Sequence, residues 1–491
     1  MTEFEKNLKE IEDMHKNGII DKETYTHMIN EIKQNMKQEE PPAVPPPPVT
    51  VVPPTPVPPP AAPPPPPAAA APPPAAPPAP PKQNVPNRAG AAGQTSETLV
   101  IKPMYPPSSI ILEMKNVSKV YDGGVRAADN INFTVGQKEF VVLLGPSGCG
   151  KSTLLNMIAG FDTITEGELF IDNESMNKVP VNSRNVAMVS QNYRNAEDKN
   201  SQKKRLELGA LSFDIPVNEN IAYDLQIRKV PKAEIDKRVN EAARMFDIEK
   251  LLARKLKALS RGQQCRVAMA RAMVKNPKVF IFDDILSDLD PNFRVMMRAE
   301  FSDIHRKLNT AIIYATDDFT EAMSMADKIV VMKDGKIQQI ESPMFLYNYP
   351  KNKFVARFMG NPQMSFLNVI VREEGRTIML DEGSLKIEAD PSHFEYLRKY
   401  AGKQIHFGIR PEDLIYYDYN ASDSVKLKVN VVQPLGAEIH LWLTTETQPL
   451  MARMPPIRLF NVGDTVNFIP KMEKARYFDK DTELSILPIP V

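Results

Sequence analysis

The segment GPSGCGKST, from Gly145 to Thr153, has the residue types and the spacing that suit binding of a phosphate group. Its glycines let the backbone curl so that successive N–H groups point at one anion. Lys151 can then reach the β- and γ-phosphates of a nucleotide, and the Ser152 hydroxyl can hold Mg²⁺. The expected phosphate-binding residues are Gly145, Pro146, Ser147, Gly148, Cys149, Gly150, Lys151, Ser152 and Thr153.

The residues on either side of this loop predict the elements that must position it. Phe140–Leu144 form a short apolar run, which indicates a buried strand, and a helical apolar pattern begins at Leu154. A helix that starts at the loop adds its dipole to the attraction for phosphate. Strand, glycine loop and helix together predict a P-loop, and therefore a nucleotide site.

Further polar residues follow apolar runs elsewhere in the chain. Asp283 ends the run KVFIF, where a carboxylate at the end of a strand can hold Mg²⁺. Gln191 follows the run VAMVS, where its amide could coordinate the metal and sense the γ-phosphate. Tyr121 precedes the P-loop and could stack on a base, although a tyrosine there is otherwise an ordinary strand residue.

Bulk composition limits the class of protein. A chain of 491 residues is too long for one core, so about three domains are expected. Basic and acidic residues number 61 each, and this balance does not suggest a nucleic-acid partner. The two cysteines, Cys149 and Cys265, exclude a disulfide framework and fit a reducing compartment.

Hydropathy predicts no membrane-spanning segment. Outside the Pro/Ala tract, no run approaches the roughly 18 apolar residues that a spanning helix needs. The first ten residues are charged and lack the apolar core of a signal peptide. We therefore expect a protein that is cytosolic or held at a membrane by its partners.

The N-terminal part divides into two expected segments. Residues 1–38 have helical apolar spacing interrupted by Gly18, which predicts a helical hairpin that is too small to be stable alone. This hairpin resembles the two-helix SHOCT module, and it would serve docking or self-association, or have no role of its own. Residues 39–108 form a Pro/Ala-rich, disordered linker, read as a semi-rigid spacer or as an SH3-type ligand.

Taken with the segments LSRGQQCR and ILSDLD, these motifs resemble in order and spacing the ATPases of ABC transporters. The resemblance covers about residues 110–345 and implies an α/β P-loop NTPase domain over 109–345. The segment HFGIRPEDL resembles the opening of the TOBE domain of sugar importers of the maltose and multiple-sugar type, rather than of polyamine or anion importers. Short alternating runs agree with a small, all-β, OB-like barrel that follows a linker within 346–491.

The resemblance implies a mechanism in which two ATPase domains dimerise head to tail around ATP and Mg²⁺. Tyr121 would stack on adenine, and Ser260, Gly262 and Gln263 would reach the γ-phosphate held by the other subunit. Ser152, Gln191 and Asp283 would hold the metal. The implied partners are membrane permease subunits, an external substrate-binding protein acting indirectly, and a second ATPase in a homodimer or heterodimer, at the inner face of the cell membrane.

The chain departs from the family pattern where the chemistry occurs. Asp284 stands in place of a glutamate that polarises the attacking water, and a misplacement of about 1 Å can reduce a rate on the order of 100-fold. Asp317 stands in place of a histidine, and its charge at ~4 Å from phosphate would cost about 4 kcal/mol at an effective dielectric of ~20. Arg261 replaces a glycine, and a charged insertion follows Gln191.

These departures predict that ATP binding is retained and hydrolysis is slow. The opposing interpretation is that Asp284 serves adequately and Asp317 points away from the phosphate. Two functions remain open on the sequence: an ATP-binding subunit that drives carbohydrate import, or a hydrolysis-deficient regulatory or scaffold subunit.

Overall fold

The computed structural model describes residues 110–490, apart from residues 191–210, 288, 309 and 418–423. All described residues belong to the second of the two units into which the chain divides, residues 99–491. The hairpin expected over 1–38 and the linker expected over 39–108 lie outside the described residues. Gln191 and the charged insertion after it also lie outside them.

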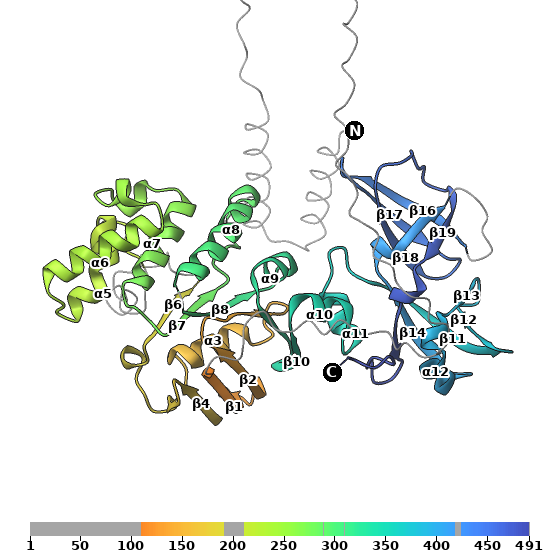
Figure 1. Cartoon of the computed structure of the whole chain (residues 1–491), viewed down its shortest axis with the longest axis horizontal. Helices are drawn as coiled ribbons and strands as arrows, with labels where there is room; N and C mark the ends of the chain where they lie inside the picture. The colour runs from red at the N-terminus through yellow and green to blue at the C-terminus, as the bar shows by residue number, and fades with distance from the viewer. Residues whose placement is uncertain (1–109, 191–210, 288, 309, 418–423, 491) are drawn as a thin grey trace, which may run out of the picture. The chain divides into compact units, whose positions relative to one another are not determined.

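A six-stranded sheet with the order β10-β9-β3-β8-β7-β6 forms the centre of the N-terminal domain (Figure 1). Its inner strands pair in parallel, and β10 returns antiparallel to β9. Parallel strands covered on both faces must be apolar throughout, and every residue of β3 and β8 is buried. The strands are β3 Phe140–Leu144, β6 Val186–Ser190, β7 Val279–Asp283, β8 Ala311–Thr316, β9 Lys328–Lys333 and β10 Lys336–Glu341.

Side chains that alternate between the two faces of the sheet pack into two separate apolar cores. Val142 and Leu144 of β3 pack into one apolar cluster with helices α5–α9, and Val141 and Leu143 pack into the other with α3. Successive side chains of a strand point to opposite faces, so one apolar run supplies both cores. The helices are α3 Lys151–Ala159, α5 Val217–Ile227, α6 Lys232–Met245, α7 Arg261–Met273, α8 Pro291–Leu308, α9 Phe319–Met325, α10 Pro343–Asn348 and α11 Lys353–Phe358.

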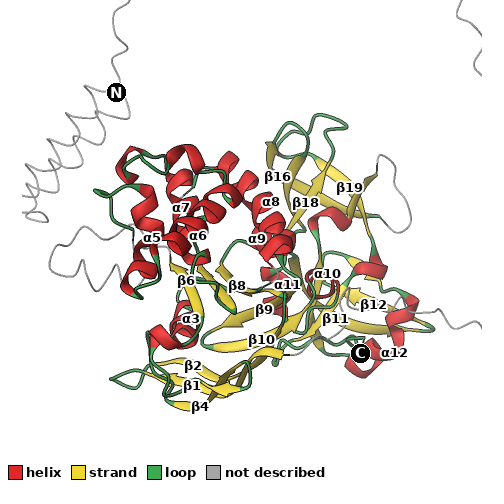
Figure 2. Ribbon diagram, turned by 60° about the vertical axis from the view of Figure 1, so that its left-hand side comes forward, coloured by secondary structure: helices red, strands yellow, loops and turns green. Residues whose placement is uncertain are grey.

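A second, antiparallel sheet with the order β2-β1-β4-β5 packs beside α3 (Figure 2). Its strands are β1 Ile110–Val120, β2 Arg126–Gly136, β4 Glu166–Ile171 and β5 Glu174–Ser175. Leu112, Met114 and Val117 of β1 are buried in the α3 core. This packing brings the end of β1 close to the start of α3.

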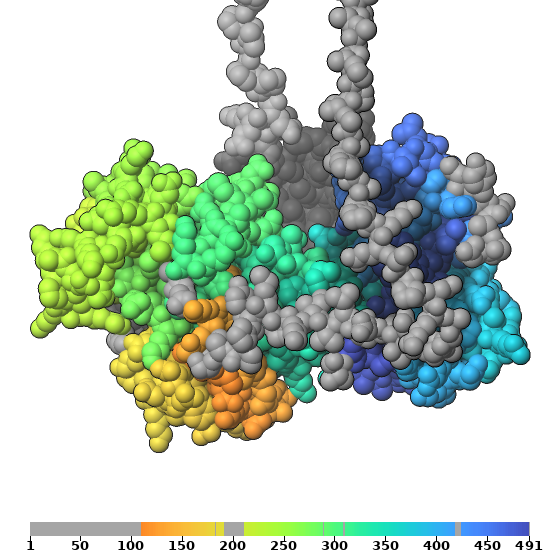
Figure 3. All heavy atoms as spheres, in the orientation of Figure 1, coloured from red at the N-terminus to blue at the C-terminus, as the bar shows by residue number. Residues whose placement is uncertain are grey.

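Helices α5, α6 and α7 form a group of their own. In the space-filling view their residues make a continuous light-green lobe (Figure 3). Asp224 of α5 forms ion pairs with Arg271 of α7 and with Lys275 just after α7, at 3.2 and 3.0 Å. Because Asp224 and Arg271 are both buried, this charged cluster joins α5 to α7 inside the helical group.

The C-terminal part is built from two antiparallel five-stranded sheets, β13-β12-β11-β14-β20 and β15-β19-β16-β17-β18. The inward residues of both sheets share one apolar cluster. The expected small β domain is therefore present, with two sheets around its core where a single barrel was expected. Its elements are β11 Ser365–Glu374, β12 Thr377–Asp381, β13 Lys386–Glu388, α12 Phe394–Leu397, β14 Gln404–Ile409, β15 Leu414–Tyr417, β16 Val425–Pro434, β17 Ile439–Thr444, β18 Pro449–Met454, β19 Thr465–Pro470 and β20 Arg476–Asp479.

The segment between the two domains packs with the first. Helix α10 spans the boundary expected between residues 345 and 346. Leu346 of α10, Val355 of α11 and Met359 are buried in the same cluster as α5–α9. Core packing therefore favours a boundary near residue 360. Within the described ranges, no helix is both long enough and apolar enough to cross a membrane.

Candidate functional site

The predicted P-loop lies between β3 and α3, as the sequence pattern requires. Gly150 has φ 104°, and a Cβ there would lie 2.3 Å from the Ala127 carbonyl oxygen. A Cβ on Gly145 would lie 2.4 Å from the Met332 carbonyl oxygen. Both positions therefore require glycine, one for its conformation and both for the close approach of neighbouring backbone. Lys151 is buried, and its Nζ donates to the Gly145 carbonyl oxygen over 2.7 Å.

The structure brings together two of the predicted metal-holding side chains. Ser152 Oγ donates to Asp283 Oδ1 over 3.0 Å, from the first turn of α3 to the end of β7. Burial raises the pKa of Asp283, although the hydrogen bond from Ser152 and the charge of Lys151 act the other way. A hydroxyl and a carboxylate oxygen side by side are ligands that suit Mg²⁺, so the described residues fit this ion.

The third predicted metal group, Gln191, lies outside the described residues. Strand β6 ends at Ser190, and Ser190 is the register partner of Asp283 in the parallel pair β6–β7. The carboxyl ends of parallel strands share one edge of the sheet, so the chain enters the Gln191 segment at the edge that carries Asp283.

Asp284 and Asp317, which stand at the predicted catalytic positions, follow neighbouring strands. Asp284 has φ 50°, and its backbone N–H donates to the Ala315 carbonyl oxygen over 3.0 Å. Burial and then the charge of Asp317 raise the pKa of Asp284 to about 6. Ser147 Oγ of the P-loop lies 3.5 Å from Asp317 Oδ2. The carboxylate of Asp317 therefore lies beside the loop that the sequence assigns to phosphate, and Asp284 follows the neighbouring strand.

Glu321 is a buried acid at this edge of the sheet that the sequence reasoning missed. It is 1% exposed, and its Oε2 accepts hydrogen bonds from Tyr314 Oη at 2.7 Å and Thr316 Oγ1 at 2.8 Å. Burial raises its pKa, against the effect of those two hydrogen bonds. A sequence signal existed, because Asp318 caps α9 and Glu321 stands at the third helical position, a spacing typical of helix starts.

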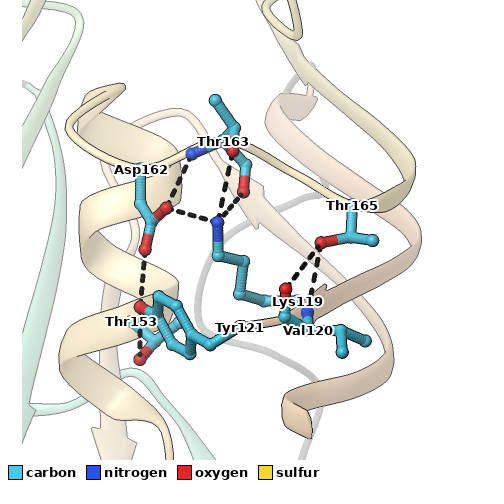
Figure 4. A network of polar contacts seen from close by, with 7 residues as sticks. All are labelled: Lys119, Val120, Tyr121, Thr153, Asp162, Thr163 and Thr165. Atoms are coloured by element: carbon cyan, nitrogen blue, oxygen red, sulfur yellow. Dashed lines mark hydrogen bonds and ion pairs between the residues drawn. The ribbon is translucent and has the colours of Figure 1, made fainter. Parts of the chain in front are cut away.

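Tyr121, the predicted base-stacking residue, follows the last residue of β1 and is 40% exposed. Its hydroxyl donates to Asp162 Oδ2 over 2.5 Å and lies 3.5 Å from Thr153 Oγ1 of the P-loop segment (Figure 4). The ring that could receive a base is therefore anchored to the turn after α3, and its hydroxyl lies close to the first turn of that helix, which follows the predicted P-loop.

The predicted signature residues form the start of α7. Ser260 caps the helix by accepting from the Gln263 backbone N–H over 3.3 Å, and the Gln263 side chain accepts from the Ser260 N–H over 3.1 Å. A Cβ on Gly262 would lie 2.0 Å from the ring of Phe293 in α8. Arg261, at the variant position, is exposed. The motif is thus a helix start with a capping box and one tightly packed glycine.

Fold and site together define a P-loop nucleotide-binding protein with an added β domain. Comparison with known proteins agrees: a family model described as ABC transporter matches residues 128–287. A model for the MalK OB fold domain matches residues 360–414, and one for the TOBE domain matches residues 407–478.

Three curated relatives align along nearly their whole lengths. The oligosaccharides import ATP-binding protein MsmX of Bacillus subtilis is 41% identical over 384 residues, 76% of this chain and 99% of that one. The uncharacterized ABC transporter ATP-binding protein YurJ of Bacillus subtilis is 40% identical over 380 residues, 76% and 99% of the two chains. The maltose/maltodextrin import ATP-binding protein MalK of Mannheimia succiniciproducens is 40% identical over 380 residues, 75% and 96% of the two chains.

The chain belongs to the ATP-binding subunits of ABC transporters. This family match confirms the sequence-based identification, including the β domain that follows the ATPase domain.

Proposed function

We propose that this chain binds ATP with Mg²⁺, hydrolyses it slowly, and in this way drives a transporter that imports a carbohydrate. The observation that carries the nucleotide site is the contact between Ser152 Oγ and Asp283 Oδ1 at the mouth of the P-loop. The carbohydrate assignment is supported by the names of two relatives, which import oligosaccharides and maltose or maltodextrin.

The individual roles follow the motifs. The backbone of Gly145–Thr153 would cradle the phosphates, with Lys151 on the β- and γ-phosphates, and Tyr121 would stack on adenine. Ser152, Asp283 and Gln191 would hold Mg²⁺, which when bound neutralises the charge that develops on the phosphate oxygens. Ser260, Gly262 and Gln263 would reach the γ-phosphate on a second subunit, as the family resemblance implies.

Slow hydrolysis is supported by the surroundings of Asp284. A base must be ionised and within reach of the attacking water. The short side chain of Asp284 starts from a backbone whose N–H is held by the Ala315 carbonyl oxygen, which limits the reach of its carboxylate. Its pKa, raised to about 6, leaves Asp284 mostly ionised near neutral pH, so reach and not protonation would slow the reaction. Asp317 adds negative charge 3.5 Å from Ser147 of the P-loop, where a γ-phosphate would bring more.

Assembly would follow the family pattern. Two ATP-binding subunits would close around the nucleotides, and permease subunits would dock at the helical group α5–α7 and the Gln191 segment at the inner face of the membrane. An external substrate-binding protein would act through the permeases. In a homodimer both sites would carry Asp284, Asp317 and Arg261.

A second candidate is favoured by Asp284 and Asp317 themselves. If these carboxylates suppress hydrolysis completely, the chain would be a regulatory or scaffold subunit. ATP binding would then close the pair of ATP-binding subunits, and no hydrolysis would follow to open it again. The same site would bind ATP in either case, so turnover decides between the two functions.

The test is the steady-state ATP turnover of the purified full chain, measured beside its affinity for ATP. Lys151→Ala supplies the blank, and the double change Asp284→Glu with Asp317→His supplies the rescue. We expect tight binding, slow turnover and an increase of on the order of 100-fold in the rescued chain. Robust turnover in the unmodified chain would contradict slow hydrolysis. Slow turnover that the double change leaves unaltered would contradict the assignment to Asp284 and Asp317, and weak ATP binding would contradict the nucleotide site.

A further inference from the structure

Asp162, in the turn after α3, connects the segments that surround Tyr121 (Figure 4). Its Oδ2 accepts the Tyr121 hydroxyl over 2.5 Å, and its Oδ1 forms an ion pair with the ammonium of Lys119. Lys119 Nζ also donates to the Thr163 carbonyl oxygen over 2.8 Å. One carboxylate therefore holds two side chains from the end of β1 against the turn after α3.

The surroundings of the Asp162 carboxylate favour its ionised form. Burial alone would raise the pKa of Asp162, but the hydrogen bonds from Lys119 and Tyr121 lower it below its usual range. Lys119 is 6% exposed, so its ammonium depends on the groups in the turn for its hydrogen bonds. Buried charges are retained only when they are paired, which explains why the turn and β1 stay together.

The Tyr121 ring is held on two sides. Its hydroxyl is anchored by Asp162 and lies 3.5 Å from Thr153 Oγ1, and Lys119 Nζ lies 4.9 Å from the ring centroid. Tyr121 nevertheless remains 40% exposed, which leaves surface that a base could contact. Thr153 follows Ser152 directly, so the ring and the phosphate-binding residues are placed by the same first turn of α3.

We propose that Asp162 is a positioning residue for nucleotide binding: by holding the Tyr121 hydroxyl it presents the ring to the adenine base at a set distance from the P-loop. This inference rests on the proposed ATP site. Ordering a side chain on binding lowers affinity by a factor of about two to ten, and a ring that is already held avoids this loss. The contribution of Asp162 therefore depends on the hydroxyl of Tyr121 and on the base of the ligand.

The experiment compares two ligands by isothermal titration calorimetry on the full chain, without Mg²⁺ so that no hydrolysis occurs. ATP carries the base, and inorganic tripolyphosphate carries only the phosphates. Tyr121→Phe keeps the ring and the Lys119–Asp162 ion pair but removes the hydroxyl. We expect it to weaken ATP binding about threefold to tenfold and to leave tripolyphosphate binding unchanged. Tyr396→Phe, in α12, is the matched control.

Variants of Asp162 complete a double-mutant cycle. Asp162→Ala should weaken ATP binding as much as Tyr121→Phe does, and the two changes together should weaken it no further. Asp162→Asn keeps an acceptor for the hydroxyl and should restore most of the affinity. If Asp162→Ala proves too unstable to titrate because Lys119 loses its ionic partner, Asp162→Asn meets the same loss of charge, and Tyr121→Phe, which keeps the ion pair, still tests the proposal.

Other results would overturn the positioning role, the adenine contact or the ATP site. Unaltered ATP affinity in Tyr121→Phe overturns the positioning role, as does an equal loss for ATP and tripolyphosphate. Tyr121→Ala tests the premise separately: if it does not weaken ATP binding, the adenine contact itself is wrong. If wild-type chain binds neither ligand, the proposed ATP site is wrong.

Discussion

Ser152 and Asp283 are 131 positions apart in the chain, and the hydroxyl of the first donates to the carboxylate of the second over 3.0 Å. The first lies in the helix that follows β3, and the second ends β7. Strand β8 separates β3 from β7 in the sheet, so the contact crosses one intervening strand. This relationship places a metal-suited oxygen pair beside the phosphate loop.

The first prediction concerns this pair. Ser152→Ala should abolish most of the gain in ATP affinity that Mg²⁺ produces, because one of the ion's oxygen ligands is removed. Affinity for ATP without Mg²⁺ should change little. Calorimetry with and without the ion measures both, with the exposed Ser175→Ala as control. Equal affinities of wild type and variant at saturating Mg²⁺ would contradict a metal role for Ser152.

The second prediction concerns the charge of Asp317. Because burial and Asp317 raise the pKa of Asp284 to about 6, ionised Asp284 destabilises the folded chain above that pH and protonated Asp284 does not. Asp317→Asn removes the repulsion and should raise Tm by about 1–3 °C at pH 7.5. The gain should shrink as the pH falls through about 6, because Asp284 then becomes protonated in the wild-type chain, and it should be smaller at pH 5 than at pH 7.5.

Thermal unfolding without nucleotide across this pH range tests the second prediction. Asp481→Asn, at an exposed position near the C-terminal end, is the control for loss of one negative charge. A gain in Tm that is the same at pH 5 and pH 7.5 would show that Asp317 does not act through Asp284.

The third prediction concerns the signature helix. Gly262→Ala places a Cβ 2.0 Å from the Phe293 ring and should lower the free energy of unfolding by about 1–3 kcal/mol. Shortening the neighbour with Phe293→Leu should recover part of that loss in the double variant. Urea unfolding measures both. Gly136→Ala, whose Cβ would have contacts no closer than 3.4 Å, should lower the free energy of unfolding less. An equal loss of stability at both glycines would refute the packing argument.

The fourth prediction concerns the buried charges of the helical group. Asp224→Asn leaves Arg271 and Lys275 without their carboxylate and should lower the free energy of unfolding by about 3–5 kcal/mol at pH 7. Burial alone would raise the pKa of Asp224, but Arg271 and Lys275 lower it. The stabilisation is therefore present above the unfolded-state pKa of about 3.9 and is lost in stronger acid.

Chemical unfolding at pH 7 and at pH 3 tests the fourth prediction. Asp236→Asn, an exposed position on α6, should change stability little at either pH. An Asp224→Asn chain as stable as wild type at pH 7 would show that the two cations find other partners.

The sequence alone determined the P-loop, because all of its functional residues lie within one short segment. Glycine conformations, the lysine and the hydroxyl are set by neighbours a few positions away, and the apolar runs on either side place them on a strand and a helix. The same holds for Asp283 at the end of β7 and for the capping residues Ser260 and Gln263. A motif whose residues lie close together in the sequence can be recognised from the sequence alone.

Only the tertiary structure decided which distant residues meet. The contact of Ser152 with Asp283, the packing of Gly262 against Phe293 and the anchoring of Tyr121 by Asp162 each depend on strand order and helix packing. Such contacts arise from burial summed over whole elements, and no short window of residues encodes them. For this reason the sequence named the nucleotide site, whereas the folded chain showed which side chains hold its parts together.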